Sequence, residues 1–400
     1  MKILVISNKV PYPAKDGSSI AMASSIDGLL KNKAEVHLLS LNTLKHFKGD
    51  AEINKELPSS LHFNKENVNT NITPFNTLSN LLSKQAFHVS RFFQPSVVQR
   101  LITILKNTTF DVIQLEGLSL AVYINCIREN SQAKIVLRAH NVEYQIWERH
   151  LANEKNPIKK WYLKLQVNRL KKFEISTLTR IDGLVCITDK DSSIFSKLKP
   201  DLAKTSIPCG VNMAHYPSPQ LSTNPSFDIS YLASFDWLPN VQGMDWFMTK
   251  VWPEILRLRP QTTLTLGGRS MPAHFKKWET AHFVLESNVP NAAAFIAKGR
   301  VVVIPLLAGS GMRIKIIENM AMGKAMVSTP VGAEGIFTNN ENNLLLAQEP
   351  TTFAQKVLHL LDNSSERKRL ELNAYQTAKT HYENQMLGNQ FLDFYKKLLC

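Results

Sequence analysis

The sequence predicts an α/β protein with two doubly wound, Rossmann-like domains that face each other across a cleft. Its 400 residues exceed what a single hydrophobic core usually supports. Short apolar, β-branched runs alternate with longer helical stretches, a pattern typical of parallel sheets covered by helices on both faces. A Pro-, Ser- and Asn-rich stretch at Pro208–Ser226 separates two sets of such runs and is typical of a linker.

Each set contains five predicted strands. Those of the first half are Lys2–Ser7, Glu35–Leu41, Asp111–Leu115, Lys134–Ala139 and Gly183–Ile187. Those of the second half are Asp228–Ala233, Thr262–Gly267, Val301–Pro305, Ala325–Ser328 and Asn343–Ala347. We therefore expect domains at residues 1–208 and 227–380, a linker at 209–226 and a C-terminal helix at 381–400. Ligands of such sheets bind at the carboxyl ends of the strands, so functional residues should follow strands.

The composition and charge exclude several classes of protein. With 44% hydrophobic and 20% charged residues the chain is globular, not disordered. The four cysteines form no CxxC pair, which argues against a disulfide scaffold or a zinc site. We expect a cytoplasmic protein, because no signal peptide and no apolar run of membrane-spanning length is evident. Of the net charge of +14, most lies in residues 1–208, which contain 29 basic and 18 acidic residues.

The most informative segment joins the predicted strand Val301–Pro305 to a helix that should begin near Arg313. Between them, Gly309-Ser310-Gly311 allows a tight turn and exposes backbone N–H groups to a ligand. The N-terminus of a helix favours a phosphate, and basic residues there oppose the helix dipole unless an anion binds. Arg313 and Lys315 stand in that position, so the segment predicts a phosphate site. The plain alternative is a strand–turn–helix unit whose charges face solvent.

Residues 309–324 (GSGMRIKIIENMAMGK), followed by VSTPVGAEG, resemble the donor-binding signature of family-4 retaining glycosyltransferases with the GT-B fold. Many members have two glutamates eight positions apart. The second matches Glu318, which the resemblance implies binds the nucleotide ribose, whereas the first falls at Ser310. A subgroup with a Gly-rich turn, Arg-x-Lys and a single glutamate shares this departure. Backbone N–H groups of the bend, including that of Met312, would then hold the donor sugar.

The resemblance covers nearly the whole chain. Ser7–Ser19, with Gly17 at a helix start, is similar to the first loop of these enzymes, where a glycine approaches the donor from the opposite domain. The resemblance implies that residues 1–208 serve the acceptor and residues 227–380 the nucleotide-sugar donor. It also implies that the C-terminal helix returns to the first domain, and that the sugar keeps its anomeric configuration.

Ser234–Asn240 and Leu266–Arg269 resemble the first two strand-end loops of the nucleotide domain. Members often have an Arg and a Lys in the first of these loops, and this sequence has neither. We therefore expect Arg269 to join Arg313 and Lys315 in neutralising the diphosphate. With these cations present, we expect no metal and no other cofactor.

The predicted strand Lys134–Ala139 is followed by His140-Asn141-Val-Glu143. A lone histidine is more often structural, but in similar enzymes a histidine of this loop faces the donor sugar near the reacting carbon. Because imidazoles titrate near neutral pH, His140 could donate a proton to the sugar or to the leaving group. We expect Asn141 and Glu143 to shape the loop or to meet the acceptor.

Asp189-Lys190-Asp191 matches the D-x-D pattern of metal-dependent nucleotide-sugar enzymes. However, Thr188 followed three residues later by Asp191 also has the spacing of a helix capping box. Acidic residues in a first turn are favoured by the helix dipole alone. We therefore expect a cap here and no metal.

Residues Lys155–Lys172 contain seven basic residues and no acidic one. Leu163, Val167, Leu170 and Phe173 recur at helical spacing and predict a core-facing stripe. The basic face is either a solvated surface or a site for anionic lipid headgroups. Attraction to an anionic lipid surface is worth about 1 kcal/mol per basic residue. Nucleic acid is disfavoured, because no nucleic-acid-binding motif accompanies the charge.

The sequence thus predicts a glycosyltransferase that moves a sugar from a nucleoside-diphosphate sugar to a glycan or glycolipid acceptor hydroxyl, either free in the cytoplasm or at the inner face of the membrane. Polysaccharide or glycolipid assembly is the usual setting of similar enzymes. Two alternatives remain open: a nucleotide-sugar 2-epimerase of the same fold, and a catalytically silent nucleotide-binding partner subunit.

Overall fold

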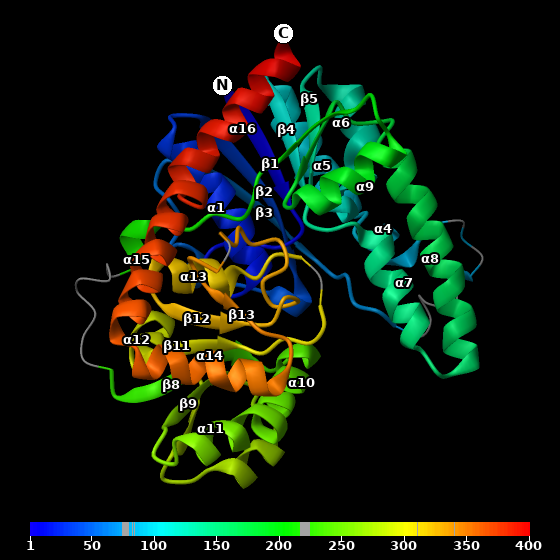
Figure 1. Ribbon diagram of the computed structural model, residues 1–400. Coiled ribbons are helices and arrows are strands. Elements are labelled where there is room, and N and C mark those ends of the chain that lie inside the picture. Colours follow the sequence, from blue (N-terminus) through cyan, green and yellow to red (C-terminus); the bar gives the residue numbers. More distant parts are fainter. Residues whose placement is uncertain (74–79, 82, 84, 217–224, 310, 340) are drawn as a thin grey trace. The chain divides into compact units, whose positions relative to one another are not determined.

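The computed structural model describes residues 1–73, 80–81, 83, 85–216, 225–309, 311–339 and 341–400 (Figure 1). Its internal contacts divide the chain into two compact units. Unit 1 comprises residues 1–210 and 384–400, and unit 2 comprises residues 211–383. The predicted linker region thus begins at the junction of the units, although its residues 217–224 lie outside the described part of the chain.

Unit 1 contains a parallel sheet with the strand order β3-β2-β1-β4-β5-β6-β7. Its strands are β1 (Lys2–Ser7), β2 (Glu35–Thr43), β3 (His62–Val68), β4 (Val112–Glu116), β5 (Lys134–Ala139), β6 (Gly183–Cys186) and β7 (Ala203–Ser206). Its helices are α1 (Gly17–Lys31), α2 (Asp50–Ile53), α4 (Phe87–Ser90), α5 (Pro95–Asn107), α6 (Ile124–Asn130), α7 (Glu143–Asn153), α8 (Pro157–Thr177), α9 (Asp189–Leu198) and α16 (Asn384–Leu399).

Both faces of this sheet are buried. Successive residues of a strand point to opposite sides, so one strand contributes to two apolar clusters. Leu4 and Ile6 of β1 belong to one apolar cluster, whereas Ile3 and Val5 belong to another. Helices α5 and α6 contribute to the first cluster, and α1 and α16 contribute to the second. This two-sided burial explains why the central strands are continuous apolar runs.

Helix α16 packs along α1 in unit 1 (Figure 1). Two glycines allow the close approach: a Cβ at Gly388 would lie 2.1 Å from the backbone oxygen of Gly28. Asn32, the C-cap residue of α1, also donates a hydrogen bond of 2.7 Å to the backbone oxygen of Gln385. The C-terminal segment is therefore an integral part of unit 1.

Unit 2 contains a second parallel sheet with the order β10-β9-β8-β11-β12-β13. Its strands are β8 (Phe227–Ser234), β9 (Leu264–Arg269), β10 (Phe283–Ser287), β11 (Gly299–Ile304), β12 (Ala325–Ser328) and β13 (Leu345–Leu346). Its helices are α10 (Leu238–Trp246), α11 (Trp252–Leu258), α12 (Ala292–Ala297), α13 (Ile314–Ala321), α14 (Pro350–Asp362) and α15 (Ser364–His381). Two parallel sheets with flanking helices confirm the predicted fold class.

Candidate functional site

The glycine bend of unit 2 joins β11 to α13. Gly309 has φ +132° and Gly311 has φ +78°, conformations that a side chain would strain. A Cβ at Gly309 would also lie 2.9 Å from the ring of Trp237. Ser310 lies outside the described residues. The helix begins at Ile314 with Arg313 as its N-cap residue, one position later than the sequence suggested.

Three predicted cations meet residues 234–240, a segment that runs from the last residue of β8 into the first turn of α10. The Arg313 guanidinium lies over the Trp237 ring, 5.1 Å from its centroid. The Lys315 ammonium donates a 3.0 Å hydrogen bond to Asn240 Oδ1. Arg269 Nε donates a 2.8 Å hydrogen bond to Ser234 Oγ. The structure thus brings Arg269 to the same segment as Arg313 and Lys315, although Arg269 is far from both in the sequence.

Burial makes two of these cations costly to hold in their charged forms. Burial and the charge of the neighbouring Arg313 together lower the pKa of Lys315 to about 7, against the opposite effect of Glu318. Burial also lowers the pKa of Arg313, although the Glu334 carboxylate acts in the opposite direction. A bound diphosphate would offset both effects, because it supplies negative charge in the same surroundings. Arg269 differs, since it is exposed and lies 3.3 Å from the Asp236 carboxylate.

Glu318 lies on α13, one turn beyond the bend. Its Oε1 atom accepts a 2.9 Å hydrogen bond from the Tyr216 hydroxyl. Burial raises the pKa of Glu318 above its usual value, although Tyr216 and Lys315 act in the opposite direction. Oε2 can still accept a hydroxyl, so the residue can serve a diol such as a ribose.

Unit 1 has a pocket of about 450 Å³ at the carboxyl ends of its strands. His140, Asn141 and Glu143 all line it, as the sequence predicted for residues that follow β5. Its other lining residues are Asn8, Lys9, Ser18, Thr43, Lys45, His46, Thr70, Asn71, Ile72, His88, Arg91, Phe92, Glu116, Gly117, Leu118 and Ser119. The pocket is polar on several sides and has room for a sugar-sized ligand.

His140 is held by a carboxylate that the sequence analysis missed. Its Nε2 atom lies 2.7 Å from Glu116 Oε2, and since a carboxylate only accepts, Nε2–H is the donor. This leaves Nδ1 for a ligand: Nδ1 accepts a hydrogen bond when the ring is neutral and donates one only when the ring is protonated. Proton donation from His140 to a ligand therefore runs through Nδ1 and requires the doubly protonated ring.

Glu116 is fully buried at the end of β4 and belongs to a polar network. Burial would raise the pKa of Glu116, but the charge of Arg138 and the hydrogen bond from His140 lower it below its usual value. Arg138 Nη1 lies 3.4 Å from both carboxylate oxygens. Gln114 also donates to Glu116 and in turn accepts from the hydroxyl of Tyr395 on α16. The C-terminal helix thereby helps to position His140.

Glu143 begins α7 beside His88, with 3.8 Å between His88 Nε2 and Glu143 Oε2. Burial raises the pKa of Glu143 to about 7 and lowers that of His88 to about 4. Glu174 of α8 accepts the backbone N–H groups of Glu143 and Tyr144, at 3.0 and 2.9 Å. This carboxylate caps α7 and so fixes the loop that carries His140.

Gly17 is the first residue of α1, and Asp16 caps that helix. The Asp16 carboxylate accepts the N–H groups of Ser18 and Ser19, both at 3.1 Å, and lies 2.6 Å from the Lys9 ammonium. Although burial acts to raise it, these contacts lower the pKa of Asp16 to about 2. A carboxylate of the protein therefore already satisfies two of the backbone donors at this helix start.

The D-x-D segment is a helix cap, as predicted. Thr188 Oγ1 accepts the N–H of Asp191 at 3.1 Å and donates to the Asp191 carboxylate at 2.9 Å. The acidic residues lie in the first turn of α9, where the helix dipole favours them. All four cysteines are free thiols. No helix among the described residues is long and apolar enough to cross a membrane.

Beyond Glu116, the sequence analysis missed Trp237, Asn240 and Tyr216 as site residues. Asn240 is buried in the first turn of α10 and accepts from both Lys315 and the Tyr231 hydroxyl, which ties α10 to α13 and β8. Glu116 had a detectable signal, because an acidic residue directly follows the predicted strand of residues 111–115 at the ligand-binding end of the sheet. Tyr216 had none, because its partner Glu318 is 102 residues away.

The sequence is similar to a known protein family and to one curated bacterial protein. Residues 226–363 match the family described as "Glycosyl transferases group 1". A Klebsiella pneumoniae protein, described as an uncharacterized 44.6 kDa protein in the cps region, is 24% identical over 96% of this chain and 97% of its own length. The matched family segment includes the glycine bend, α13 and the segment of residues 234–240.

Solved structures match over nearly the whole chain. Sucrose-phosphate synthase from Thermosynechococcus elongatus has a TM-score of 0.69 at 14% identity, over 100% of this chain and 99% of its own. Anabaena HepE in complex with UDP has a TM-score of 0.68 at 14% identity, over 99% and 100%. The architecture is therefore the GT-B fold, and together with the family match it supports a glycosyltransferase.

Proposed function

We propose that this protein is a retaining glycosyltransferase that moves a hexosyl group from a nucleoside-diphosphate sugar to an acceptor hydroxyl during polysaccharide or glycolipid assembly. The observation that carries the proposal is the convergence of Arg313, Lys315 and Arg269 on the segment of residues 234–240 beside the glycine bend. HepE, which shares the fold, has been crystallised with UDP and with UDP-glucose. The cps-region relative favours a polysaccharide setting.

In this proposal the donor binds unit 2. Glu318 accepts the ribose hydroxyls, and the backbone of Gly309–Met312 contacts the phosphates and the sugar. As the glycosidic C–O bond breaks, negative charge develops on the diphosphate. Arg313 and Lys315 stabilise this charge, and since their positions are fixed before the reaction, little reorganisation is needed. Three cations make a metal unnecessary, so transfer should persist in EDTA.

The unit 1 pocket is the proposed acceptor site, with His140 as the catalytic residue that faces the sugar and Asn141 and Glu143 beside it. His140 presents Nδ1 to the ligand, because Glu116 engages Nε2. We place the protein in the cytoplasm, where nucleoside-diphosphate sugars are available.

The first test is thermal shift against a panel of nucleoside-diphosphate sugars, because a true ligand raises Tm by mass action. Acceptor-dependent release of the nucleoside diphosphate would then support transfer. Epimerised donor after incubation without acceptor would support the 2-epimerase instead. Binding without turnover, with lipid and sugar acceptors present, would support a silent partner subunit.

Glu318→Gln is expected to weaken donor binding about tenfold or more, because a neutral amide with a single acceptor oxygen replaces a carboxylate that accepts from both Tyr216 and the ribose. The measurement is calorimetric Kd for the donor found in the thermal-shift screen. Glu371→Gln, a half-buried acidic residue on α15, is the matched control and should bind as wild type. Equal Kd values for the two variants would contradict the ribose assignment.

Donor affinity should fall as pH rises through 7. Lys315 has its pKa lowered to about 7 in the unliganded protein, so it loses its charge between pH 6 and 8. If only the charged form binds the diphosphate, Kd should rise about fivefold from pH 7 to pH 8. The diphosphate of a nucleotide sugar does not titrate in this range. Lys315→Gln should abolish this dependence of Kd on pH. If the variant keeps the pH dependence of wild type, Lys315 does not bind the diphosphate.

Helix α8 supplies the proposed membrane surface. Helices α7 and α8 lie side by side and extend from the sheet of unit 1 (Figure 1). The predicted apolar stripe faces inward, since Val167 and Leu170 are buried. Near the start of α8, Ile158 and Trp161 are 77% and 61% exposed, and exposed lysines flank them: Lys155, Lys159, Lys160 and Lys164. Exposed apolar groups among lysines suit an anionic lipid surface.

Co-sedimentation with phosphatidylglycerol vesicles tests this surface. At about 1 kcal/mol per basic residue, Lys159→Gln with Lys160→Gln should weaken binding about 30-fold at low salt. The matched control is Lys368→Gln with Lys379→Gln, which removes the same charge from α15. Equal binding by the two double variants would leave only the solvated-face interpretation.

A further inference from the structure

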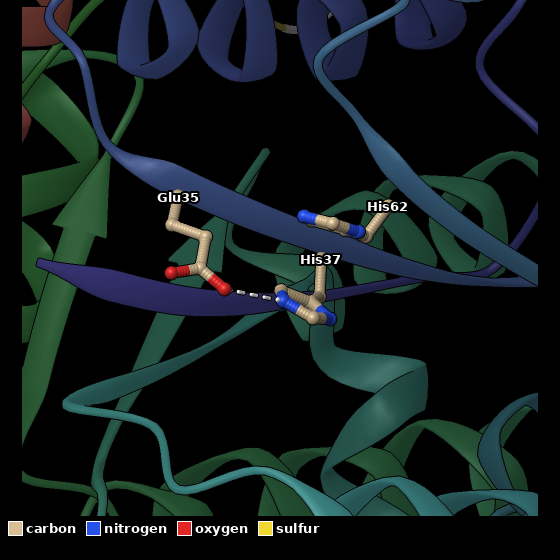
Figure 2. A group of neighbouring side chains, drawn as sticks. All are labelled: Glu35, His37 and His62. Atoms are coloured by element: carbon tan, nitrogen blue, oxygen red, sulfur yellow. Dashed lines mark hydrogen bonds and ion pairs between the residues drawn. The ribbon is translucent and has the colours of Figure 1, made fainter.

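Two histidines and a glutamate meet at the amino-terminal ends of β2 and β3. Glu35 and His37 are two residues apart on β2, so their side chains point to the same face of the sheet. His62 is the residue directly opposite His37 in the parallel β2–β3 ladder. The strand register therefore brings the three side chains together on one surface, as Figure 2 shows.

Their contacts are close. His37 Nε2 lies 3.0 Å from Glu35 Oε1, and the rings of His37 and His62 stack with centroids 4.3 Å apart. One nitrogen from each histidine and one carboxylate oxygen all lie within 4.8 Å of one another. In the part of the chain that the structure describes, no other three His, Cys, Asp or Glu side chains bring ligand atoms this close together.

We propose that Glu35, His37 and His62 form a binding site for a divalent transition-metal ion, with zinc as the reference ion. Imidazole nitrogens with one carboxylate oxygen are a donor set that suits Zn²⁺, Ni²⁺ and Cu²⁺. Three protein ligands leave the fourth tetrahedral position to water. The proposal is independent of sugar transfer and of the donor and acceptor sites.

The local structure allows the small adjustment that binding requires. Metal–ligand distances of about 2.1 Å place neighbouring tetrahedral donors about 3.4 Å apart, so the side chains must close from their present separation. Glu35 and His62 are exposed and can rotate. His37 is held edge-on against Phe110, with ring centroids 5.1 Å apart, and provides a fixed ligand.

The position of the site indicates what the ion would do. Glu116 is the last residue of β4 and His140 directly follows β5, so both lie at the carboxyl edge of the sheet. Glu35, His37 and His62 lie at the amino edge of the same sheet. The ion would therefore not contact the proposed reacting groups. It would link β2 to β3, which is an edge strand and has a neighbour on one side only. The Lys2 ammonium, 3.0 Å from Glu35 Oε1, is the cation it would displace.

The test uses full-length, untagged protein stripped with EDTA, because a histidine tag would itself bind metal. Calorimetric titration with ZnCl₂ should show a site that His62→Gln weakens by at least ~10-fold, the lower end of what even outer-shell changes cost. His359→Gln removes an exposed histidine from α14 and is the matched control, expected to bind zinc as wild type. Zinc should also raise the Tm of wild type more than that of His62→Gln.

A spectroscopic readout identifies the ligands directly. With one equivalent of Cu²⁺, the electron paramagnetic resonance spectrum of wild type should show coupling to two imidazole nitrogens. The spectrum of His62→Gln, and separately that of His37→Gln, should show coupling to one. Circular dichroism establishes that each variant is folded. Zinc affinity and copper spectra of both folded variants identical to those of wild type would overturn the proposal.

Discussion

Glu116→Gln is expected to lower the free energy of unfolding by about 3–5 kcal/mol, the usual consequence of removing one partner from a buried ion pair. The carboxylate is fully buried, and its loss would leave the buried Arg138 guanidinium uncompensated. Urea unfolding followed by circular dichroism measures the effect. Glu52→Gln is the matched control: it breaks the exposed pair with Lys15 and should change stability little.

A double variant separates charge balance from other effects. Glu116→Gln combined with Arg138→Met removes both charges, and stability should recover in part, because no unpaired charge remains. His140 would still have lost its carboxylate partner, so in the proposed transfer reaction kcat should stay low after stability recovers. If Glu116→Gln unfolds at the same urea concentration as Glu52→Gln, the ion pair is not the stabilising feature that its burial indicates.

The central strands could be predicted from the sequence because burial on both faces makes them uniformly apolar. β1, β5 and β12 have the predicted bounds, and seven other predicted strands differ by one to a few residues at their ends. The strands that were missed are β3, β7 and β10, each at the edge of its sheet. Their residues are mostly half-buried or exposed, as in the HFNKENV sequence of β3. An edge strand needs little apolar surface, so its sequence carries a weak signal.

The candidate site could be predicted where the sequence has residues that oppose local structural preference. The basic residues at the start of α13 oppose the helix dipole, and the glycines of the bend have the positive φ values that such a turn requires. The partners of these residues were not predictable. Asn240 is 75 residues from Lys315, and Glu116 is 24 residues from His140. Such pairs depend on strand order, which a single sequence does not specify residue by residue.

Arg313→Ala is expected to reduce the turnover of the proposed transfer reaction about 10–150-fold, because a charge-assisted hydrogen bond is worth roughly 1.5–3 kcal/mol. The guanidinium lies over Trp237 and donates a 2.7 Å hydrogen bond to the backbone oxygen of Gly311, so it also supports the glycine bend. Arg313→Lys separates these roles, since lysine keeps the charge but loses the planar stacking. Steady-state kinetics with the donor found by thermal shift provide the measurement.

The changes in kcat and KM of Arg313→Ala identify the role of Arg313. Equal losses in kcat and kcat/KM would mean that Arg313 acts on the charge that develops as the glycosidic bond breaks. A raised KM with unchanged kcat would mean that it only holds the diphosphate in the ground state. Arg257→Ala, which removes an exposed cation from α11, is the matched control and should leave both constants unchanged. If Arg313→Ala matches that control in both constants, the diphosphate binds elsewhere and the proposed donor site is wrong.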